Sequence, residues 1–292
     1  MYSFHHDSRN LFEGWYFKHQ KGGQTAAFIP GKSGSGDFVQ VITNRCSLHF
    51  EVKNLRVGHT LEAEGCSFGP GGIRLDLPGV KGALRYGPLT GLQSDIMGPF
   101  RHFAMECRHG VISMGHSLEG SLEIQGEVLD FDGGTGYIES DSGKSFPKEY
   151  LWVQCNDFPS HLSVMAAVAA IPFGGIHFTG CISAVALGGR EYRLATYRGA
   201  RVVAAEPDRL ILQQGKTLLR IDILERGSGS ALKSPLMGSM AGIIKECNNA
   251  TARFRLFERG LPVFDRFSRN VSFEYEMHPN KSHQRCKTAG SH

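Results

Sequence analysis

The segment LFEGWYFKHQ, residues 11–20, places one carboxylate among several aromatic side chains. Side chains alternate between the two faces of a strand, so Glu13 and Trp15 would share one face and Tyr16 would lie on the other. A carboxylate beside an indole is either a paired structural group or part of a pocket. We predict that Glu13 and Trp15 belong to the first strand of a β-barrel and line or close its interior.

A second informative segment is YLWVQCNDF, residues 150–158. In a strand, Trp152, Gln154 and Asn156 would share one face. Buried carboxamides cost free energy unless their donors and acceptors are paired, so this mixture suits the wall of a ligand cavity. Two interpretations stay open, because Gln154 and Asn156 could equally tie loops to the barrel as most buried amides do.

Other motifs that suggest chemistry lack the context they need. GCSFG at 65–69 matches a nucleophile elbow, but the segment after it reads as a turn and a strand instead of a helix. PGKS and SGKS lack the first glycine of a phosphate-binding loop. His102, His109 and His116 recur every seven residues, which would put successive members on opposite faces of a strand. We therefore expect surface or turn histidines, and we predict neither a metal nor a cofactor.

Strands dominate both halves of the chain. In SLEGSLEIQGEVLDF, residues 117–131, apolar and polar residues alternate, and similar patterns recur from DFVQVIT to NVSFEYEM with Gly- or Asp-rich turns between them. The fold class is therefore all-β. The exception is SPLMGSMAGIIKECNN, residues 234–249, where Met237, Met240, Ile244 and Cys247 at helical spacing predict one short helix near the C-terminus.

Composition and charge narrow the class of protein. The chain has 292 residues and a net charge of +4, of which three charges lie in the final tail, so no nucleic-acid partner is indicated. The seven cysteines form no C-x-x-C pair, and the N-terminus lacks the apolar core of a secretory signal. These features predict a cytoplasmic protein with reduced thiols. The sequence does not indicate an oligomeric state.

The stretch 162–187 carries no acidic or basic residue other than His177. Pro172 and two glycines interrupt it, so we predict two apolar strands joined by a turn instead of a membrane helix. The same stretch is a candidate for peripheral contact with a membrane. The Gly- and Asp-rich segment near residue 135 divides the chain into an N-terminal barrel, 1–135, and a C-terminal barrel, 136–277. The polar residues 278–292 are predicted to be a disordered tail.

Five segments, in this order along the chain, resemble the tocopherol cyclase family, particularly its shorter bacterial members. The similarity extends from about residue 8 to residue 277, and its motifs are FEGWYFKHQ, GYIESDSGKSFPKEYLWVQCNDF, YRLATYRGARV, LKSPLMG and ARFRLFERG. The resemblance implies two tandem lipocalin-like β-barrels, a fold related to that of carotenoid hydratases. It also implies an apolar cavity for a hydrophobic or amphipathic small molecule.

The chemistry implied by the resemblance is acid-catalysed cyclisation or isomerisation of a prenylated phenol, quinol or other isoprenoid-like molecule. An alkene is protonated, and a phenol oxygen captures the tertiary cation. Burial in an apolar barrel would keep a carboxyl protonated, and indole faces would stabilise the cation. Glu139 is the first choice for the acid and Glu13 the second, with Trp152 and Trp15 as aromatic partners. Tyr16, Tyr150, Gln154 and Asn156 complete the predicted ligand contacts.

The chain departs from its relatives at two positions. The plant cyclases of the family carry a Trp where this chain has Ser142, and the related hydratases carry His and Trp where Ser140 and Ser142 stand. The loss of these groups motivates a second hypothesis, a non-catalytic lipocalin-like carrier of a hydrophobic ligand. A third is a protein-binding scaffold whose barrels are filled with side chains.

Overall fold

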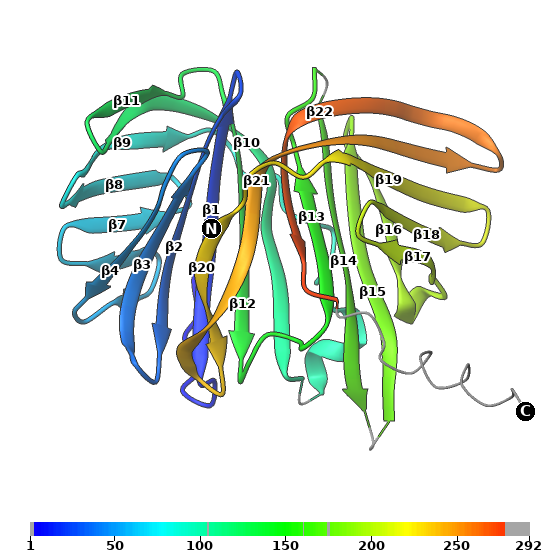
Figure 1. Cartoon of the computed structure of the whole chain (residues 1–292), viewed down its shortest axis with the longest axis horizontal. Coiled ribbons are helices and arrows are strands. Elements are labelled where there is room, and N and C mark those ends of the chain that lie inside the picture. Colours follow the sequence, from blue (N-terminus) through cyan, green and yellow to red (C-terminus); the bar gives the residue numbers. More distant parts are fainter. Residues whose placement is uncertain (1–2, 104, 160, 174–175, 278–292) are drawn as a thin grey trace, which may run out of the picture.

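The chain forms two large antiparallel sheets that lie side by side (Figure 1). The computed structural model describes residues 3–103, 105–159, 161–173 and 176–277. The predicted tail 278–292 therefore lies outside the described residues. The strands of the first sheet are β1 (Phe12–Lys21), β2 (Gln24–Ser33), β3 (Gly36–Thr43), β4 (Ser47–Val52), β5 (Arg56–Val57), β6 (Leu61–Ala63), β7 (Cys66–Gly69), β8 (Gly72–Leu77), β9 (Val80–Tyr86), β10 (Cys107–Ile124), β11 (Glu127–Asp130) and β12 (Thr135–Gly143).

The second sheet contains the remaining strands. They are β13 (Tyr150–Cys155), β14 (Leu162–Phe173), β15 (Ile176–Leu187), β16 (Arg190–Ala195), β17 (Arg201–Glu206), β18 (Arg209–Gln214), β19 (Thr217–Glu225), β20 (Ser230–Leu236), β21 (Ser239–Glu258) and β22 (Leu261–Tyr275). Among the described residues, helical structure is confined to the short 3₁₀ segments η1 (Gly98–His102) and η2 (Thr196–Arg198). None of these described helices is long and apolar enough to cross a membrane.

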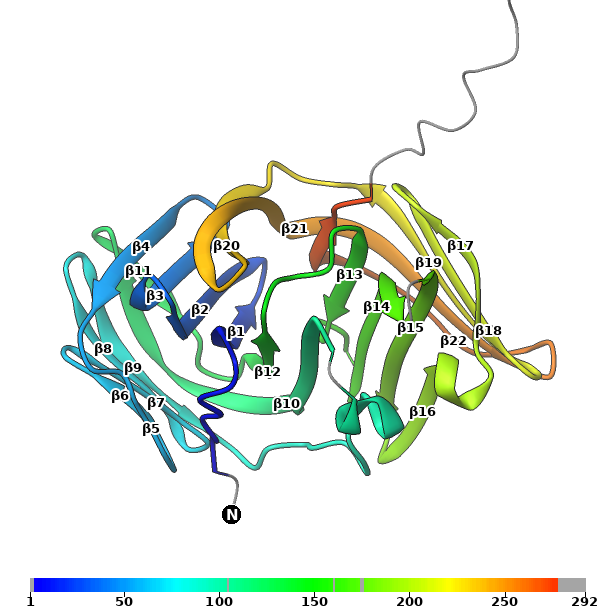
Figure 2. The same cartoon turned by 90° about the horizontal axis from the view of Figure 1, so that it is seen from below.

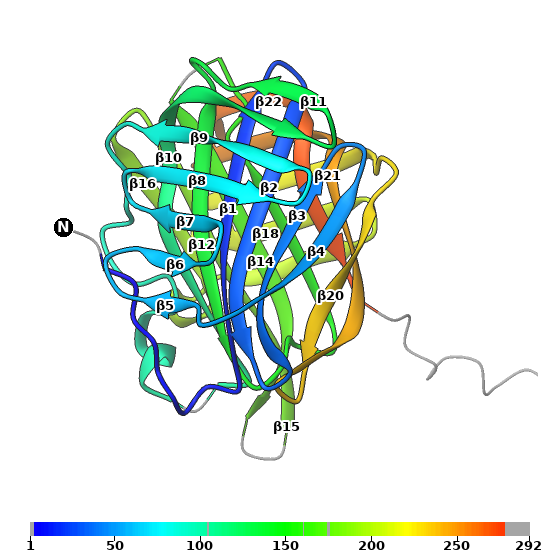
Figure 3. The ribbon, with the colours of Figure 1, turned by 90° about the vertical axis from the view of Figure 1, so that its left-hand side faces the viewer.

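Each sheet folds over on itself because its longest strands bend. The first part of β10 pairs with β12 and its last part, from Leu118, pairs with β9. Strands β5–β9 consequently cross the layer of β1–β4 at a steep angle (Figure 3). Apolar side chains fill the space between the two layers, including the fully buried Phe17, Phe28 and Phe68. In the second sheet, β21 and β22 bend in the same way around a core that contains Val153 and Phe254.

The all-β, lipocalin-like prediction is confirmed in its main features. The paired order of the first sheet runs from β4 to β5 and that of the second from β16 to β17, and pairing between these end strands is not found among the described residues. In the described residues, each unit is therefore a curled sheet that pairing between its end strands does not close into a barrel. The predicted boundary at residue 135 falls at the start of β12, which pairs in the first sheet, so the chain changes sheets between Gly143 and Tyr150.

The predicted helix at 234–249 is wrong, because this segment forms the hairpin of β20 and β21. Leu236 pairs with Ser239, and the two residues between them, Met237 and Gly238, both have positive φ angles of 48° and 81°. A two-residue turn with both φ positive matches the twist of a hairpin. The methionine spacing imitated a helical period, whereas burial along β21 alternates as in a strand.

One segment of each sheet packs against the other sheet (Figure 2). The connection between β9 and β10 is held on β16 of the second sheet, where the Arg193 guanidinium donates to the carbonyl oxygens of Ser94 and Asp95, each at 3.1 Å. In return, β20 lies on the first sheet, where the Gln40 side chain bonds to both the N–H and the carbonyl of Lys233 at 3.0 Å. The β9–β10 connection and β20 thus hold the two sheets against each other around the space between them.

Candidate active site between the two sheets

A cavity of about 190 Å³ lies between the sheets instead of inside either one. The first sheet contributes β1, β10 and β12 to its wall, and the second contributes β13, β14, β21 and β22. A cavity of about 150 Å³ suffices to hold benzene in a well-packed protein, so this space accepts an aromatic ring. Large apolar side chains fill the interior of each curled sheet, so the apolar cavity that the resemblance implies lies at the junction of the two sheets.

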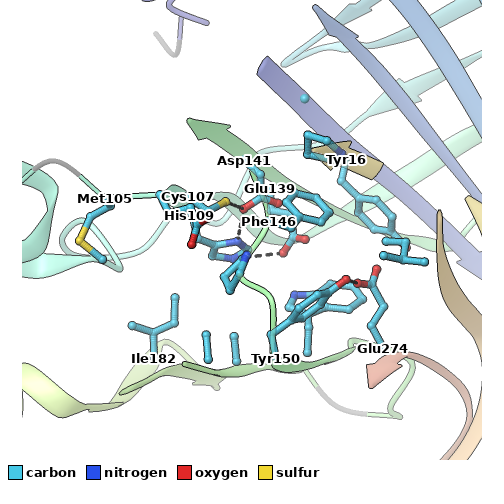
Figure 4. Close-up of a pocket in the computed structure, with 18 of the residues that line it drawn as sticks. Tyr16, Met105, Cys107, His109, Glu139, Asp141, Phe146, Tyr150, Ile182 and Glu274 are labelled. Carbon is cyan, nitrogen blue, oxygen red and sulfur yellow. Dashed lines mark hydrogen bonds and ion pairs between the residues drawn. The ribbon is translucent and has the colours of Figure 1, made fainter. Parts of the chain in front are cut away.

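Aromatic rings form much of the cavity wall (Figure 4). Tyr16 of β1 meets Trp152 of β13 edge to face, with ring centroids 5.7 Å apart, and Phe146 meets Tyr150 in the same way at 6.0 Å. Such rings present negative faces to a cation in the cavity. The Trp152 indole N–H is buried and has no hydrogen-bond acceptor among the described residues. It is therefore a donor that a ligand oxygen can use.

An ionisable cluster stands on the first-sheet wall, where β10 and β12 pair. His109 lies between two carboxylates, with Nδ1 3.0 Å from Asp141 Oδ1 and Nε2 3.4 Å from Glu139 Oε2 (Figure 4). Burial lowers the pKa of His109, but the charges of Glu139 and Asp141 and the hydrogen bond with Asp141 outweigh it and raise that pKa well above its usual value. The two flanking carboxyl groups therefore favour the protonated form of the ring. Tyr137 also donates to Glu139 Oε2, at 2.6 Å.

Two further carboxyl groups face the cavity from the second sheet, Glu246 on β21 and Glu274 on β22. Tyr16 donates to Glu246 and Tyr150 donates to Glu274, both at 2.6 Å. Burial raises the pKa of Glu246 to about 7. Burial, together with the charge of Glu246, raises the pKa of Glu274 well above its usual value. Glu246 and Glu274 thus each accept a hydrogen bond from a phenol, Glu139 contacts both a phenol and His109, and Asp141 contacts His109.

The structure brings four of the predicted site residues together. Glu139, Trp152, Tyr16 and Tyr150 all line the cavity. They do so because the outward face of each sheet, which a lone barrel would expose to water, is covered by the other sheet.

Glu13 and Trp15 are not part of this cavity wall. Trp15 packs in the core of the first sheet, 6.2 Å from the ring of Phe4. The Glu13 carboxylate accepts hydrogen bonds from the Asp7 N–H at 2.8 Å and from the Asn10 side chain at 2.9 Å, and contacts His6 at 2.5 Å. The alternative of a paired structural carboxylate therefore describes Glu13.

Gln154 and Asn156 are buried but do not line the cavity. Lys18 of the first sheet donates to Gln154 Oε1 at 2.7 Å, and Asn156 Nδ2 donates to the carbonyl of Gly136 at 2.9 Å. These amides hold the two sheets together. This role is close to the interpretation in which Gln154 and Asn156 tie loops to the barrel instead of binding a ligand. Burial lowers the pKa of Lys18 to about 8.

Ser140 and Ser142, the positions at which the chain departs from its relatives, lie outside the cavity wall. Alternation along β12 turns both serines away from the face that carries Glu139 and Asp141, and neither lines the cavity. The expectation that His109 lies on the surface or in a turn is wrong, as is that for His116, which is buried in the first sheet. His102 is exposed, as expected.

Four ionisable residues of the cavity wall were not predicted for this site, namely His109, Asp141, Glu246 and Glu274. Glu246 lay in the segment misread as a helix. Glu274 lay in the alternating strand SFEYE, where a polar face is typical of solvent exposure. The signal that could have found Glu274 is the segment SFEYE, in which carboxylates repeat on one face of a strand and a Tyr stands between them.

The donor atoms of His109, Glu139 and Asp141 lie within 4.8 Å of one another, close enough to surround one divalent cation. The sequence analysis considered His109 only together with His102 and His116, and neither of those belongs to this set. Asp141 and Glu139 occupy opposite nitrogens of the same ring, however, so a cation would have to displace one of these contacts. The observed geometry is that of one imidazole ring between two carboxyl groups.

Comparison with known proteins agrees with the motif resemblance. The family described as "Tocopherol cyclase-like" matches residues 80–200. A protein named as a probable chloroplastic tocopherol cyclase from Oryza sativa subsp. japonica is 26% identical over 173 residues, 56% of this chain and 36% of the relative. The matched part of this chain thus spans about a third of the length of that relative. The predicted resemblance is confirmed, over a shorter range than the motifs suggested.

Solved structures with the same fold cover nearly the whole chain. Kievitone hydratase from Nectria haematococca has a TM-score of 0.54 and 11% identity, with coverage of 92% of this chain and 90% of that one. CghA in complex with Sch210972 has a TM-score of 0.57 and 10% identity, with coverage of 91% and 88%. At such low identity these likenesses establish the fold alone.

Proposed function

Because this chain is similar to the tocopherol cyclase family, we propose that it is a cyclase or isomerase acting on a prenylated phenol, prenylated quinol or other isoprenoid-like small molecule. The reacting part of the substrate would lie between the two sheets. The observation that carries the proposal is a largely apolar cavity into which carboxyl groups and aromatic faces project together.

The reaction needs a proton donor, a stabilised cation and a proton acceptor. A carboxyl group of the cavity protonates the substrate alkene, which forms a C–H bond and leaves a tertiary carbocation. The faces of Trp152 and Tyr16 stabilise that charge through their ring quadrupoles. The phenol oxygen then forms a C–O bond with the cation and loses its proton to a carboxylate. No atom is gained or lost overall, so the reaction is an isomerisation.

Glu139 is the carboxyl group that both the family resemblance and the geometry support as a participant in proton transfer. It lies on the cavity wall and contacts His109 and Tyr137, which can fix its orientation. Tyr150 and the free Trp152 N–H would position polar atoms of the substrate. Gln154 and Asn156 would contribute indirectly, because they hold β13 and the residue that follows it against the first sheet.

The test is turnover of a prenylated hydroquinone by purified protein, with the chromanol product measured by liquid chromatography and mass spectrometry. General acid or base catalysis contributes about 10²–10⁴-fold, so we expect Glu139→Gln to lower kcat at least 100-fold. Glu119→Gln, a change of an exposed carboxylate on β10, is the matched control and should leave kcat unchanged. An undiminished rate in Glu139→Gln would overturn the role of this residue.

The apolar character of the cavity also favours a second candidate, a carrier that holds a hydrophobic ligand without converting it. Extraction of the purified protein with organic solvent distinguishes the two. Near one-to-one loading with an unmodified lipid, and no conversion of any prenylated phenol, would favour the carrier. Release of a cyclised product would favour the enzyme.

A further inference from the structure

We propose that the two walls of the cavity have opposite roles: the Glu246–Glu274 pair of the second sheet donates the proton, and Glu139, held by His109 on the first sheet, accepts one. This assignment rests on the proposed function, because it concerns the same cavity and the same reaction. It changes the role that the sequence suggested for Glu139 from acid to acceptor.

Strand register places the two acidic side chains of the second sheet next to each other. Trp152 of β13 pairs with Glu274 of β22, and Cys247 of β21 pairs with Phe273. Because the strands are antiparallel, the second pair puts Glu246 directly alongside Glu274. The row from Trp152 through Glu274 to Glu246 crosses three neighbouring strands on one face. An aromatic ring and two carboxyl groups therefore stand together on the cavity wall.

Both members of this pair are unfavourable as carboxylates. They are buried beside each other, and like charges directly opposite in a sheet repel. Their phenol donors supply one hydrogen bond each. Lys18 is the cation whose charge favours ionised Glu246, and the charge of Glu139 opposes it. The groups that face the pair from neighbouring strands are Tyr16 and Lys18 on β1, Glu139 and Asp141 on β12, Tyr150 on β13, and Asn248 and Ser272 on β21 and β22. At neutral pH the pair therefore holds at least one proton that it can give to a substrate.

Glu139 has the opposite environment. Its Oε2 lies 3.4 Å from the ring of His109 and 2.6 Å from the hydroxyl of Tyr137, and Asp141 holds the far nitrogen of the same ring. The His109 ring and the Tyr137 hydroxyl fix the orientation of this carboxyl group, so that its oxygens serve as acceptors toward the cavity. A carboxylate held in this way can take the phenol proton, and the resulting acid can pass it to His109 or to solvent.

The proton balance of one turnover follows from these roles. The acidic pair loses one proton to the alkene carbon, and the phenol oxygen loses one proton to Glu139 as the C–O bond forms. Product release then leaves the pair one proton short and Glu139 one proton in excess. Exchange with water through the open cavity restores both groups, so no oxidant, reductant or further reactant is required.

The first test reads protonation directly and does not depend on turnover. The infrared spectrum of the native protein at pH 6.5 should contain a protonated-carboxyl C=O band. Comparison with the variants should show this band lost or diminished in Glu246→Gln and in Glu274→Gln but kept in Glu139→Gln. Tyr150→Phe, which retains the ring and removes one hydrogen bond, should shift that band to higher frequency. A band that is lost only in Glu139→Gln would overturn the assignment.

The second test separates the two proton transfers. A prenylated hydroquinone whose attacking oxygen is methylated cannot close the ring, so deuterium uptake at its alkene in D₂O reports the donor step alone. We expect uptake to fall at least 100-fold in Glu246→Gln and Glu274→Gln and to persist in Glu139→Gln, whereas all three variants lose cyclisation of the free phenol. Uptake that requires Glu139 but neither of the other two overturns the roles. A native protein that neither cyclises the phenol nor exchanges the ether overturns the proposed function, and the infrared bands still show which carboxyl groups are protonated.

Discussion

The interiors of the curled sheets and the space between the sheets are built from opposite faces of the same strands. On β1, Trp15 and Phe17 point into the first sheet among other apolar side chains, while Tyr16 and Lys18 point to the second sheet. The interior faces are filled with apolar residues, whereas the faces between the sheets combine aromatic rings, carboxyl groups and an opening. Tight packing thus provides the stability, and the junction of two stable units provides room for chemistry.

The largest effect should come from exchanging large and small side chains across this division. Ala166 and Ala167 are neighbours on β14, but Ala166 is fully buried in the second-sheet core and Ala167 lines the cavity. We expect Ala166→Phe to lower the free energy of unfolding by about 3 kcal/mol, because overpacking a filled core forces its neighbours out of their rotamers. Chemical denaturation at equilibrium measures this loss.

Ala167→Phe is the matched variant on the other face. It should change stability by less than about 1 kcal/mol, since the ring enters open space, and it should reduce turnover of a prenylated hydroquinone about 100-fold. Equal stability losses in the two variants would show that the cavity and the core do not differ in packing.

A smaller effect should distinguish the two carboxylates that the sequence singled out. Glu13 accepts hydrogen bonds from Asp7 and Asn10 and contacts His6, outside the cavity. Because buried hydrogen bonds to charged groups contribute about 1.5–3 kcal/mol, Glu13→Gln should lower the free energy of unfolding by roughly 2 kcal/mol. Turnover by the folded fraction should be normal.

Glu139→Gln should show the reverse pattern, with lost turnover and a smaller loss of stability. Activity measured at a temperature where both variants are fully folded, as judged by circular dichroism, makes the comparison direct. Abolished turnover in folded Glu13→Gln would place that residue in the catalytic machinery and remove the contrast.

A pH dependence should separate the histidines of the two regions. In the first-sheet core, Tyr86 contacts both His19 and His116, and burial lowers the pKa of each histidine to about 3. His109 has the opposite shift because carboxylates flank it. The unfolded chain binds protons at His19 and His116 below about pH 6.5, whereas the folded chain binds them only near pH 3. Stability is therefore complete above pH 6.5 and falls as the pH drops, by about 1.4 kcal/mol per pH unit for each histidine.

His116→Phe should remove one of these contributions. The slope of unfolding free energy against pH, measured by urea denaturation between pH 4 and 6, should become shallower by about 1.4 kcal/mol per unit. His102→Asn, a change of an exposed histidine, serves as control and should leave the slope as it is. A slope that His116→Phe does not alter would mean that the core histidine is charged in the folded protein.

The same division explains what the sequence could and could not predict. Alternation in segments such as 117–131 predicted the strands, because period two is a local property of each strand. It could not predict where the cavity lies. The polar faces that carry Tyr16 or Glu274 have the pattern of solvent-exposed faces, and only the docking of one sheet on the other buries them. The mistaken helix at 234–249 arose from side-chain spacing where the positive φ of Met237 and Gly238 decided the structure.

The smallest expected signal uses the chain's two tryptophans, which lie one in each region. Trp15 is enclosed in the first-sheet core and Trp152 lines the cavity, so single-tryptophan variants report on the two regions separately. In Trp15→Phe, addition of a prenylated hydroquinone should quench the emission of Trp152 and saturate with concentration, because the ligand contacts the indole. In Trp152→Phe, the remaining Trp15 should respond only as free tryptophan does in the same solution. Saturable quenching of Trp15 instead would mean that the ligand enters the first sheet, which would require its filled core to open.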